Sequence, residues 1–589
     1  MPKFVVVIEN RDFFEGIRYV SVIVPLKLRW EPCYSTTDQQ LAVGDRVRVR
    51  VGARIYDGVV SATDIVPSVE LSKVHPVVAV EKGLERITEE EIALWRFISE
   101  YYLCTVGEVY KCAYPAVKVR SEQTAARTRE RAEALEQRRR DLYAKRIARI
   151  EERIAKKQAD LEKKHKESVA QRLASELERI QQELDSVKRR FEEGAPALPE
   201  EMLTIKDIQL SDTEVSVYER LAGQKKKPVL LSGAGPSHVR IIARLAKEML
   251  EEGKGVLYLV PEIAMGEMIR TQLSDIFGKA LMKFDSACTP TRRRRISDAV
   301  RSGEPYVIVG TRSALFLPLT NLGLVVVDEE QDASYKQTEP APRYNGRDLA
   351  VVLSSIHKCR TILVSDTPSL ESEYNCASSK YDRVSADIPY TTLAAVDVID
   401  TTAEKRKNGM LGDISRKLLE VVNDSPGRPV VLLSPYGDAQ ELKQAFSALA
   451  PDVEASAMSL YEARRNPIPK DSIVALFNSE ALVSRQDFRA DEHALQTIHQ
   501  LRLRCHRLVL QTRSSEHPVF SGTDLSVASM LEERRCFNMP PFSRIVDVRP
   551  RKGGLPERIT LPHGAALARA KKDIYGKYSE DYIIDVDPQ

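Results

Sequence analysis

A series of short apolar runs, separated by segments long enough to be helices, constrains the fold of this chain most strongly. Five such runs lie at residues 229–233, 255–261, 306–310, 322–330 and 361–366. They are nearly continuously apolar, as expected of strands in a parallel sheet that helices cover on both faces. A second set lies at 429–435, 472–477 and 507–512. The pattern predicts two tandem parallel α/β lobes, and the cleft between such lobes is a common ligand site.

The first 118 residues, or about that number, follow a different pattern. Short β-branched runs such as 19–24 and 46–51 are interrupted by glycines, which is typical of strands and turns. The segment 89–103 then begins with three glutamates and continues with apolar residues, as expected at the start of a helix. We therefore expect a β-rich N-terminal unit that ends in helical structure.

Residues 121–190 contain neither glycine nor proline, and about half of them are charged. Apolar residues recur at steps of three and four in 143–161 and again in 173–191, which predicts long helical structure. One continuous helix of about 100 Å and an antiparallel hairpin turning near His165 are equally consistent with this rhythm. We expect this coiled-coil-like segment to act as a spacer, or to mediate self-association through residues 140–191. A basic arm along phosphates is the alternative, but acidic residues interleave regularly.

The overall composition excludes several classes of protein. Lys and Arg number 88 and Asp and Glu 85, so the net charge is +3 and nucleic acid would have to bind at local basic patches. The eight cysteines form no C-x-x-C pair, so we expect reduced thiols and no bound zinc. No apolar stretch approaches 18 residues, and no signal peptide is recognisable. We expect a soluble cytoplasmic protein with no membrane partner.

Two features in the first lobe indicate nucleotide chemistry. Asp328 and Glu329 directly follow an apolar run, where nucleotide hydrolases place one carboxylate on Mg²⁺ and a second on the attacking water. The run at 229–233 leads into a glycine-containing turn and then a helix, as in a phosphate-binding loop. Gly233 and Gly235 allow the turn, but His238 and Val239 replace the expected Lys and Ser/Thr. An ordinary histidine is mostly neutral at pH 7, so phosphate binding is expected to be weak.

Longer motifs resemble the family of primosomal protein N-prime (PriA), a family of superfamily two DNA helicases that restart stalled replication. The matching segments of the first lobe are 253–264, 307–337, 342–351 and 365–372. Segments 24–30, 44–60 and 94–115 resemble the DNA-binding domain of the family, and 486–496 and 534–545 resemble its later part. The resemblance covers most of the chain except 120–205, where the family usually has a winged-helix domain.

This resemblance implies five successive parts. They are a 3′ DNA-binding domain at 1–118, a charged helical spacer at 119–200, two RecA-like helicase lobes at 205–400 and 405–525, and a small α+β domain at 526–589. Within the first part, the side chains of Trp30 and Glu31, together with Gly44, match the pocket that the family builds for a DNA 3′ end.

Several helicase motifs depart from the family pattern. His238 and Val239 align with its phosphate-contacting Lys and its Mg²⁺-contacting Thr, and the loop is one residue short. Gln331 replaces the histidine of D-E-x-H, and Asp366 replaces the alanine of Ser-Ala-Thr. Arg504 and Arg507 fall on the two arginine positions of the last motif, although its glycines are gone. The cysteine-rich zinc insertion is absent, because no cysteine lies between 376 and 505.

We therefore expect a PriA-like protein that binds DNA forks or 3′ ends and primosome proteins, with weak ATP and Mg²⁺ binding at most and with its ATPase and helicase activities lost. An active ATP-dependent 3′–5′ helicase is the first alternative. The second is a coiled-coil scaffold that does not bind DNA.

Overall fold

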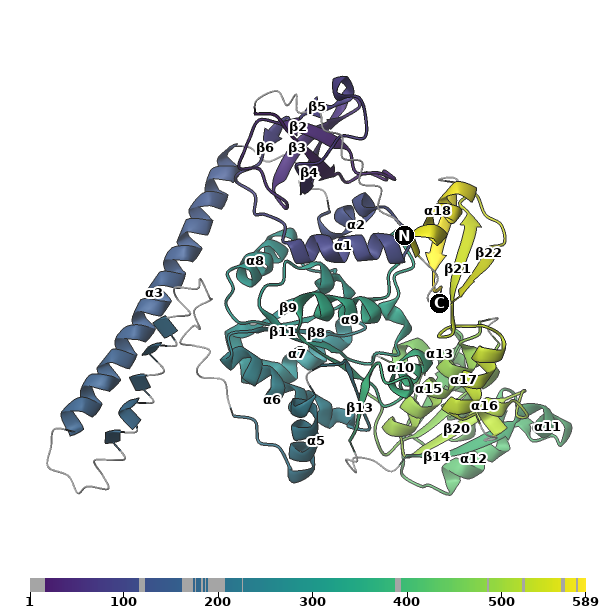
Figure 1. Ribbon diagram of the computed structural model, residues 1–589. Coiled ribbons are helices and arrows are strands. Elements are labelled where there is room, and N and C mark those ends of the chain that lie inside the picture. Colours follow the sequence, from purple (N-terminus) through teal and green to yellow (C-terminus); the bar gives the residue numbers. More distant parts are fainter. Residues whose placement is uncertain are drawn as a thin grey trace.

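A computed structural model describes most of the chain, and Figure 1 shows its arrangement. The described residues are 16–115, 122–161, eleven positions between 173 and 188, 207–224, 226–386, 393–464, 466–484, 487–521, 525–562, 567–578 and 581–588. A β-rich unit and a long helical arm precede two α/β lobes, and a small α+β unit packs beside the N-terminal one.

The N-terminal unit is a six-stranded sheet followed by two helices. Its strands are β1 (Arg18–Ile23), β2 (Cys33–Thr36), β3 (Arg46–Val51), β4 (Arg54–Thr63), β5 (His75–Pro76) and β6 (Ala79–Val80), in the order β5-β2-β1-β4-β3-β6. Helix α1 (Glu89–Tyr101) begins with a capping box, in which Thr88 and Glu91 each bond the backbone N–H of the other. Helix α2 (Val106–Ala113) starts in the same way at Thr105. The expected β-rich unit with a helical end is therefore present.

The charged segment forms an antiparallel hairpin. Helix α3 spans Glu122–Leu161, and helical residues between 173 and 188 run back along it. Lys157 contacts Glu176 at 2.5 Å and Lys188 contacts Glu151 at 3.1 Å, an order that only opposite chain directions allow. The apolar side chains pack between the two arms, with Tyr143, Ile150, Ile180 and Val187 buried. The turn expected near His165 lies outside the described residues.

The first lobe is a seven-stranded parallel sheet in the order β13-β7-β12-β11-β8-β10-β9. Its strands are β7 (Val229–Ser232), β8 (Gly255–Leu259), β9 (Leu281–Phe284), β10 (Val307–Gly310), β11 (Leu322–Val327), β12 (Arg360–Val364) and β13 (Asp382–Ser385). Its helices are α5 (Asp212–Gly223), α6 (His238–Glu251), α7 (Ile263–Phe277), α8 (Pro290–Arg301), α9 (Gly346–His357) and α10 (Leu370–Ala377). The five apolar runs are the buried strands that the sequence predicts.

The second lobe has a five-stranded parallel sheet in the order β14-β20-β19-β17-β18. Its strands are β14 (Ala395–Asp400), β17 (Val430–Ser434), β18 (Ala455–Ser459), β19 (Ile473–Leu476) and β20 (Arg507–Thr512), and a two-residue ladder joins β15 (Met410–Leu411) to β16 (Ile414–Ser415). Its helices are α11 (Thr401–Arg406), α12 (Arg416–Asn423), α13 (Ala439–Leu449), α14 (Leu460–Ala463), α15 (Ala490–Arg504) and α16 (Pro518–Ser521), followed by α17 (Val527–Cys536). The predicted division at 400/405 is wrong, because β14 pairs with β20 of this second sheet.

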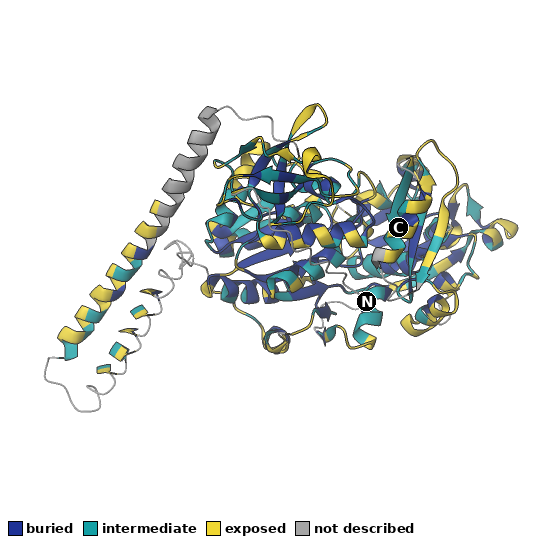
Figure 2. Cartoon of the chain, turned by 45° about the horizontal axis from the view of Figure 1, so that its top comes forward, coloured by how far each residue is buried: buried dark blue, intermediate teal, exposed yellow. Residues whose placement is uncertain are grey.

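The C-terminal unit joins the N-terminal unit and the first lobe in one hydrophobic core. It contains β21 (Ser543–Pro550), β22 (Glu557–Pro562), α18 (Leu567–Lys577) and β23 (Tyr582–Val586). Trp95 of α1, Leu349 of α9 and Val546 of β21 belong to the same buried cluster. Figure 2 shows this continuous buried interior and, in contrast, the exposed helical arm.

Two further features concern the cysteines and the length of the apolar helices. All eight cysteines are free thiols. Within the described ranges, no helix is both long and apolar enough to cross a membrane.

Candidate functional site

The turn between β7 and α6 is already occupied by a carboxylate of the chain itself. Gly233 and Gly235 adopt φ values of 71° and 49°, which glycine tolerates best. The backbone N–H of Gly235 points to Oδ1 of Asp366, at 3.4 Å. A phosphate-binding loop uses such N–H groups to hold an anion. Here the anion is the side chain that replaces the family's alanine after β12.

His238 begins α6 and is held through both ring nitrogens. Nδ1 lies 2.5 Å from the carbonyl oxygen of Gly235, and Nε2 lies 3.2 Å from Oδ2 of Asp328. Burial by itself would lower the pKa of His238, but the Asp328 carboxylate and the two hydrogen bonds raise it to about 9. The expectation of a mostly neutral histidine is therefore wrong. The ring carries a positive charge at pH 7, and this charge is paired with the Asp328 carboxylate.

Asp328 lies at the end of β11 with both carboxylate oxygens in use. Its exposed fraction is 2 %. Oδ2 accepts a hydrogen bond from the Tyr258 hydroxyl at 2.9 Å in addition to the contact with His238, and Oδ1 accepts one from the backbone N–H of Glu329 at 3.0 Å. A Mg²⁺ ion would have to displace partners that already neutralise this oxygen. Tyr258 lies in an ordinary apolar run, so no sequence pattern singles it out.

Glu329 is the point where the second lobe reaches the predicted nucleotide site. Its Oε2 accepts hydrogen bonds from the Gln331 amide at 2.5 Å and from the Gln500 amide of α15 at 3.1 Å. Burial, together with the neighbouring Asp328 carboxylate, raises the pKa of Glu329 to about 7. Gln331, the residue that replaces the family's histidine, therefore bonds the Glu329 carboxylate directly.

The other residues predicted for this site point elsewhere. The Arg504 guanidinium donates to the carbonyl oxygens of Ala463 and Asn466, both at 2.6 Å. Arg507 forms a two-point ion pair with Asp397 at 2.6 and 3.1 Å, within the second sheet. The Val239 side chain is buried in the core of the first lobe. The structure thus brings together His238, Asp328 and Glu329 and leaves out Arg507, while Arg504 lies close enough to feel the charge of Glu329 but donates its hydrogen bonds within the second lobe.

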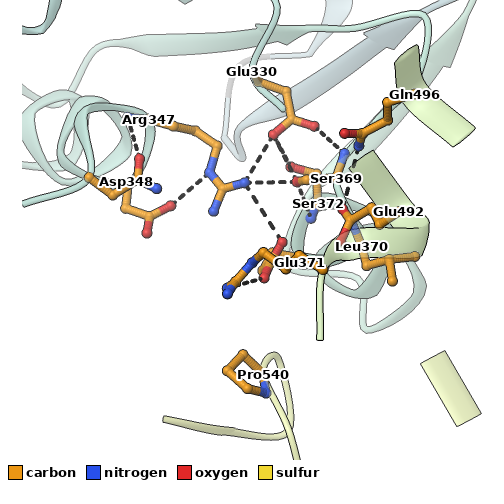
Figure 3. A network of polar contacts seen from close by, with 12 residues as sticks. Glu330, Arg347, Asp348, Ser369, Leu370, Glu371, Ser372, Glu492, Gln496 and Pro540 are labelled. Atoms are coloured by element: carbon orange, nitrogen blue, oxygen red, sulfur yellow. Dashed lines mark hydrogen bonds and ion pairs between the residues drawn. The ribbon is translucent and has the colours of Figure 1, made fainter. Parts of the chain in front are cut away.

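A buried network of charges joins the two lobes, and sequence reasoning missed it. Figure 3 shows Glu330 and Arg347 beside Ser369, with Glu371 and Glu492 close by. Arg347 donates to Ser369 at 2.8 Å and contacts Glu330 at 3.3 Å.

From the later part of the chain, two arginines complete this network. Arg489 contacts Glu371 at 3.0 Å, and Arg534 contacts Glu492 at 2.5 Å. Burial would raise the pKa of Glu371, but the surrounding arginines lower it to about 2. The carboxylate is therefore charged throughout the neutral range, and it binds the second lobe tightly to the first.

Trp30 and Glu31 line a cavity between the N-terminal sheet and α18. Trp30 is 66 % exposed, so its indole ring is accessible rather than part of a core. Glu31 accepts a hydrogen bond from the Ser61 hydroxyl and lies 3.7 Å from the Arg96 guanidinium. The cavity has a volume of about 180 Å³ and also contacts Lys571 and Tyr575. An exposed aromatic ring beside a held carboxylate is suited to stacking on a base and accepting a hydroxyl.

Gly44 has a structural reason to be glycine. Its φ is 92°, and a Cβ atom there would lie 2.0 Å from the carbonyl oxygen of Ile87. Its N–H donates to Val60 at 2.8 Å, which ties the turn before β3 to β4. The structure does not place Gly44 on the lining of the Trp30 cavity.

Comparison with known proteins adds two family models and several relatives. The 3′DNA-binding domain of PriA matches residues 21–115, and the DEAD/DEAH box helicase model matches 232–375. The chain is 38 % identical over 198 residues to replication restart protein PriA of Rickettsia prowazekii (strain Madrid E), which covers 33 % of this chain and 30 % of that protein. It is 37 % identical over 194 residues to the protein of the same name from Haemophilus influenzae (strain ATCC 51907), covering 32 % and 26 %. The chain thus aligns with less than a third of each relative's length.

Proposed function

We propose that this chain, which belongs to the family of replication restart protein PriA, binds branched or 3′-ended DNA in replication restart and has lost efficient ATP turnover. One observation carries the second half of the proposal. The Asp366 side chain accepts a hydrogen bond from the Gly235 N–H that a phosphate would need, and the His238 ring contacts the Asp328 oxygen that a metal ion would need.

Electrostatics at the turn support weak nucleotide binding. A family-type loop offers a lysine to the phosphates, whereas the charge of His238 is already paired with Asp328 at 3.2 Å. Asp366 adds a carboxylate at the turn, with its Oδ1 3.4 Å from the backbone nitrogen of Gly235. A phosphate group would therefore meet a like charge and a cation that is already neutralised.

The residues present fit a bound Mg²⁺ ion poorly. Val239 is buried and has no hydroxyl to offer, and both oxygens of Asp328 have partners. Arg507 is paired with Asp397 inside the second lobe, and Arg504, although it is near Glu329, donates to backbone carbonyl oxygens of that lobe instead of pointing to a γ-phosphate. These contacts argue against the active helicase alternative.

ATP turnover tests this half of the proposal. With forked DNA present, we expect a rate below about 1 s⁻¹, which is low for an enzyme. The double variant His238→Lys, Val239→Thr should stay slow, because the loop remains one residue short and Asp366 remains in place. A parent rate above this limit, measured by phosphate release, would show that other groups replace the missing ones. Full activity in the double variant would show that the rest of the site is intact.

The DNA-binding half rests on the match of residues 21–115 and on the exposed Trp30. The binding of 3′ ends is proposed for this chain from the match to the 3′DNA-binding domain, and the binding of forks and primosome proteins from the resemblance of its sequence motifs. The scaffold alternative is less well supported, because the apolar side chains of the hairpin pack between its own two arms. The acidic and basic residues of the arm pair in the same way, for example Lys157 with Glu176.

Trp30→Ala should weaken the affinity for a 3′-ended fork by about 1–3 kcal/mol, the usual value of stacking on one base. Stacking carries no charge, so the slope of log affinity against log salt should not change. Titration of labelled fork at several salt concentrations measures both quantities. The control is Trp95→Phe, in the buried core, which should leave the affinity unchanged if the protein folds. Equal affinities of Trp30→Ala and the parent would remove Trp30 from the site.

A further inference from the structure

Helix α8 carries four consecutive arginines, Arg292 to Arg295, at the edge of the first lobe. Arg292, Arg294 and Arg295 are exposed, whereas Ile296 and Val300 on the opposite face are buried. In the described part of the chain, these three guanidinium groups form no ion pair and no side-chain hydrogen bond. We call these three residues the arginine face.

The fourth arginine has a structural role. The Arg293 guanidinium donates to the carbonyl oxygens of Cys288 and Asp285, both at 3.3 Å, and lies over the Phe284 ring at 5.2 Å. It therefore fixes the start of α8 against the end of β9. The arginine face has no such partner and needs another explanation.

The position of the arginine face is unfavourable for α8 itself. Positive side chains in the first turns of a helix oppose the helix dipole, and like charges three or four residues apart repel each other. No acidic residue lies in the first turn of α8 to compensate them. A bound polyanion would relieve both costs, and arginine is well suited to phosphate groups because it offers two parallel N–H donors.

Helix α8 is also attached to the unit that matches the DNA-binding family model. Arg301, at the end of α8, contacts Glu85, and it donates to the Tyr114 hydroxyl at 3.0 Å. Figure 1 shows α8 at the end of α1, below the N-terminal sheet. Helix α1 has 13 residues and so spans about 20 Å, and the other end of α1 borders the Trp30 cavity through Ser99. The end of α8 that carries Arg301 therefore lies at one end of α1 and the Trp30 cavity at the other, and the arginine face lies about two turns farther along α8.

We propose that the arginine face is a second DNA contact, which binds the sugar–phosphate backbone of a strand whose 3′ end lies in the Trp30 cavity. The proposal rests on the DNA binding proposed above. The arginine face would hold the arm of the fork and add affinity without reading its sequence.

The test compares two triple variants of the full chain on one 3′-ended fork. Arg292→Ala, Arg294→Ala, Arg295→Ala removes the arginine face. Lys405→Ala, Arg406→Ala, Lys407→Ala removes the same charge from exposed positions in and beside α11, at the far end of the second lobe. Each lost phosphate contact should make the salt slope shallower by about 0.9. We expect the slope of log affinity against log salt to be shallower by about 2–3 in the first variant. Its affinity at 50 mM salt should be at least about tenfold weaker.

The control triple variant should keep the slope and affinity of the parent. Circular dichroism should give the arginine-face variant at least the helix content of the parent, because removing these charges favours α8. An unchanged slope in a folded arginine-face variant would overturn the proposal and assign this face to an acidic protein segment instead. Equal losses in both triple variants would also overturn it, because the effect would then be one of net charge. A parent that binds no fork at low salt would overturn the proposed function itself.

Discussion

Replacing Arg534 with alanine is expected to lower the free energy of unfolding by about 3–5 kcal/mol, the usual cost of breaking a buried ion pair from one side. The Arg534 side chain is 5 % exposed and lies 2.5 Å from Glu492, which is 6 % exposed. Its other amino group donates to the carbonyl oxygen of Pro540 at 3.2 Å. Without the arginine, the buried Glu492 side chain would lose its ion-pair partner in the interface between the lobes.

The neighbouring residue provides a matched control. Arg535 lies in the same helix and contacts Glu532 at 2.8 Å, but both side chains are more than half exposed. Arg535→Ala should cost about 0–1 kcal/mol, as surface pairs do. Urea unfolding followed by circular dichroism measures both variants. If the two cost the same, the network in Figure 3 does not hold the lobes together.

The ion pair of His238 and Asp328 should make the stability of the protein depend on pH. The folded pKa of His238 is about 9, raised above the ordinary value of 6.5. A raised pKa stabilises the folded state fully below pH 6.5, and this contribution is lost as the pH rises to 9. The pKa difference corresponds to about 3 kcal/mol. The parent should therefore lose about that much stability between pH 6 and pH 9.5 through this one group.

His238→Gln isolates this contribution. Glutamine keeps a hydrogen-bonding side chain but does not titrate, so the variant should lose the part of the decline that His238 contributes, whereas the part that comes from the raised pKa of Glu329 remains in both proteins. Urea unfolding at pH 6 and at pH 9.5, for both proteins, gives the difference. If the parent and the variant decline equally, His238 is not charged in the folded protein, and the pairing with Asp328 is weaker than the geometry indicates.

The buried strands of both lobes could be predicted because a parallel sheet needs continuous apolar runs, and few other structures do. Strand β14 lacks such a continuous apolar run, and the prediction therefore assigned it to the wrong lobe. Its sequence, AVDVID, alternates, and most of its residues are partly exposed at the edge of the sheet. Nothing within such a strand reveals which sheet it joins. The hairpin and the single long helix could not be distinguished, because the same apolar rhythm fits both.

The sequence predicts which residues form the candidate site but not the charge that His238 carries there. Asp328, Glu329 and His238 were expected together, since all three follow strands of one sheet. The charge of His238 depends on Asp328, which lies 90 residues away in the sequence, so no local pattern could show it. The roles expected of Arg504 and Arg507 depended on alignment alone, and their bonds to Ala463 and Asp397 show other uses for them.

The shared core of the two terminal units has a consequence for synthesis of the chain. Trp95 and Ile98 of α1 reach their final surroundings only when Val546 and Val586 are available, and Lys571 bonds the carbonyl oxygen of Ser99 at 2.9 Å. At roughly 5–20 residues per second, the ribosome needs on the order of half a minute to a minute and a half between these segments. During that time the part of α1 that packs against α18 lacks its partner, whereas the contacts of α1 with α2 and α9 involve segments that are made much earlier. The N-terminal unit is therefore synthesised early but completes its packing late. Chaperones have a long interval in which to bind it.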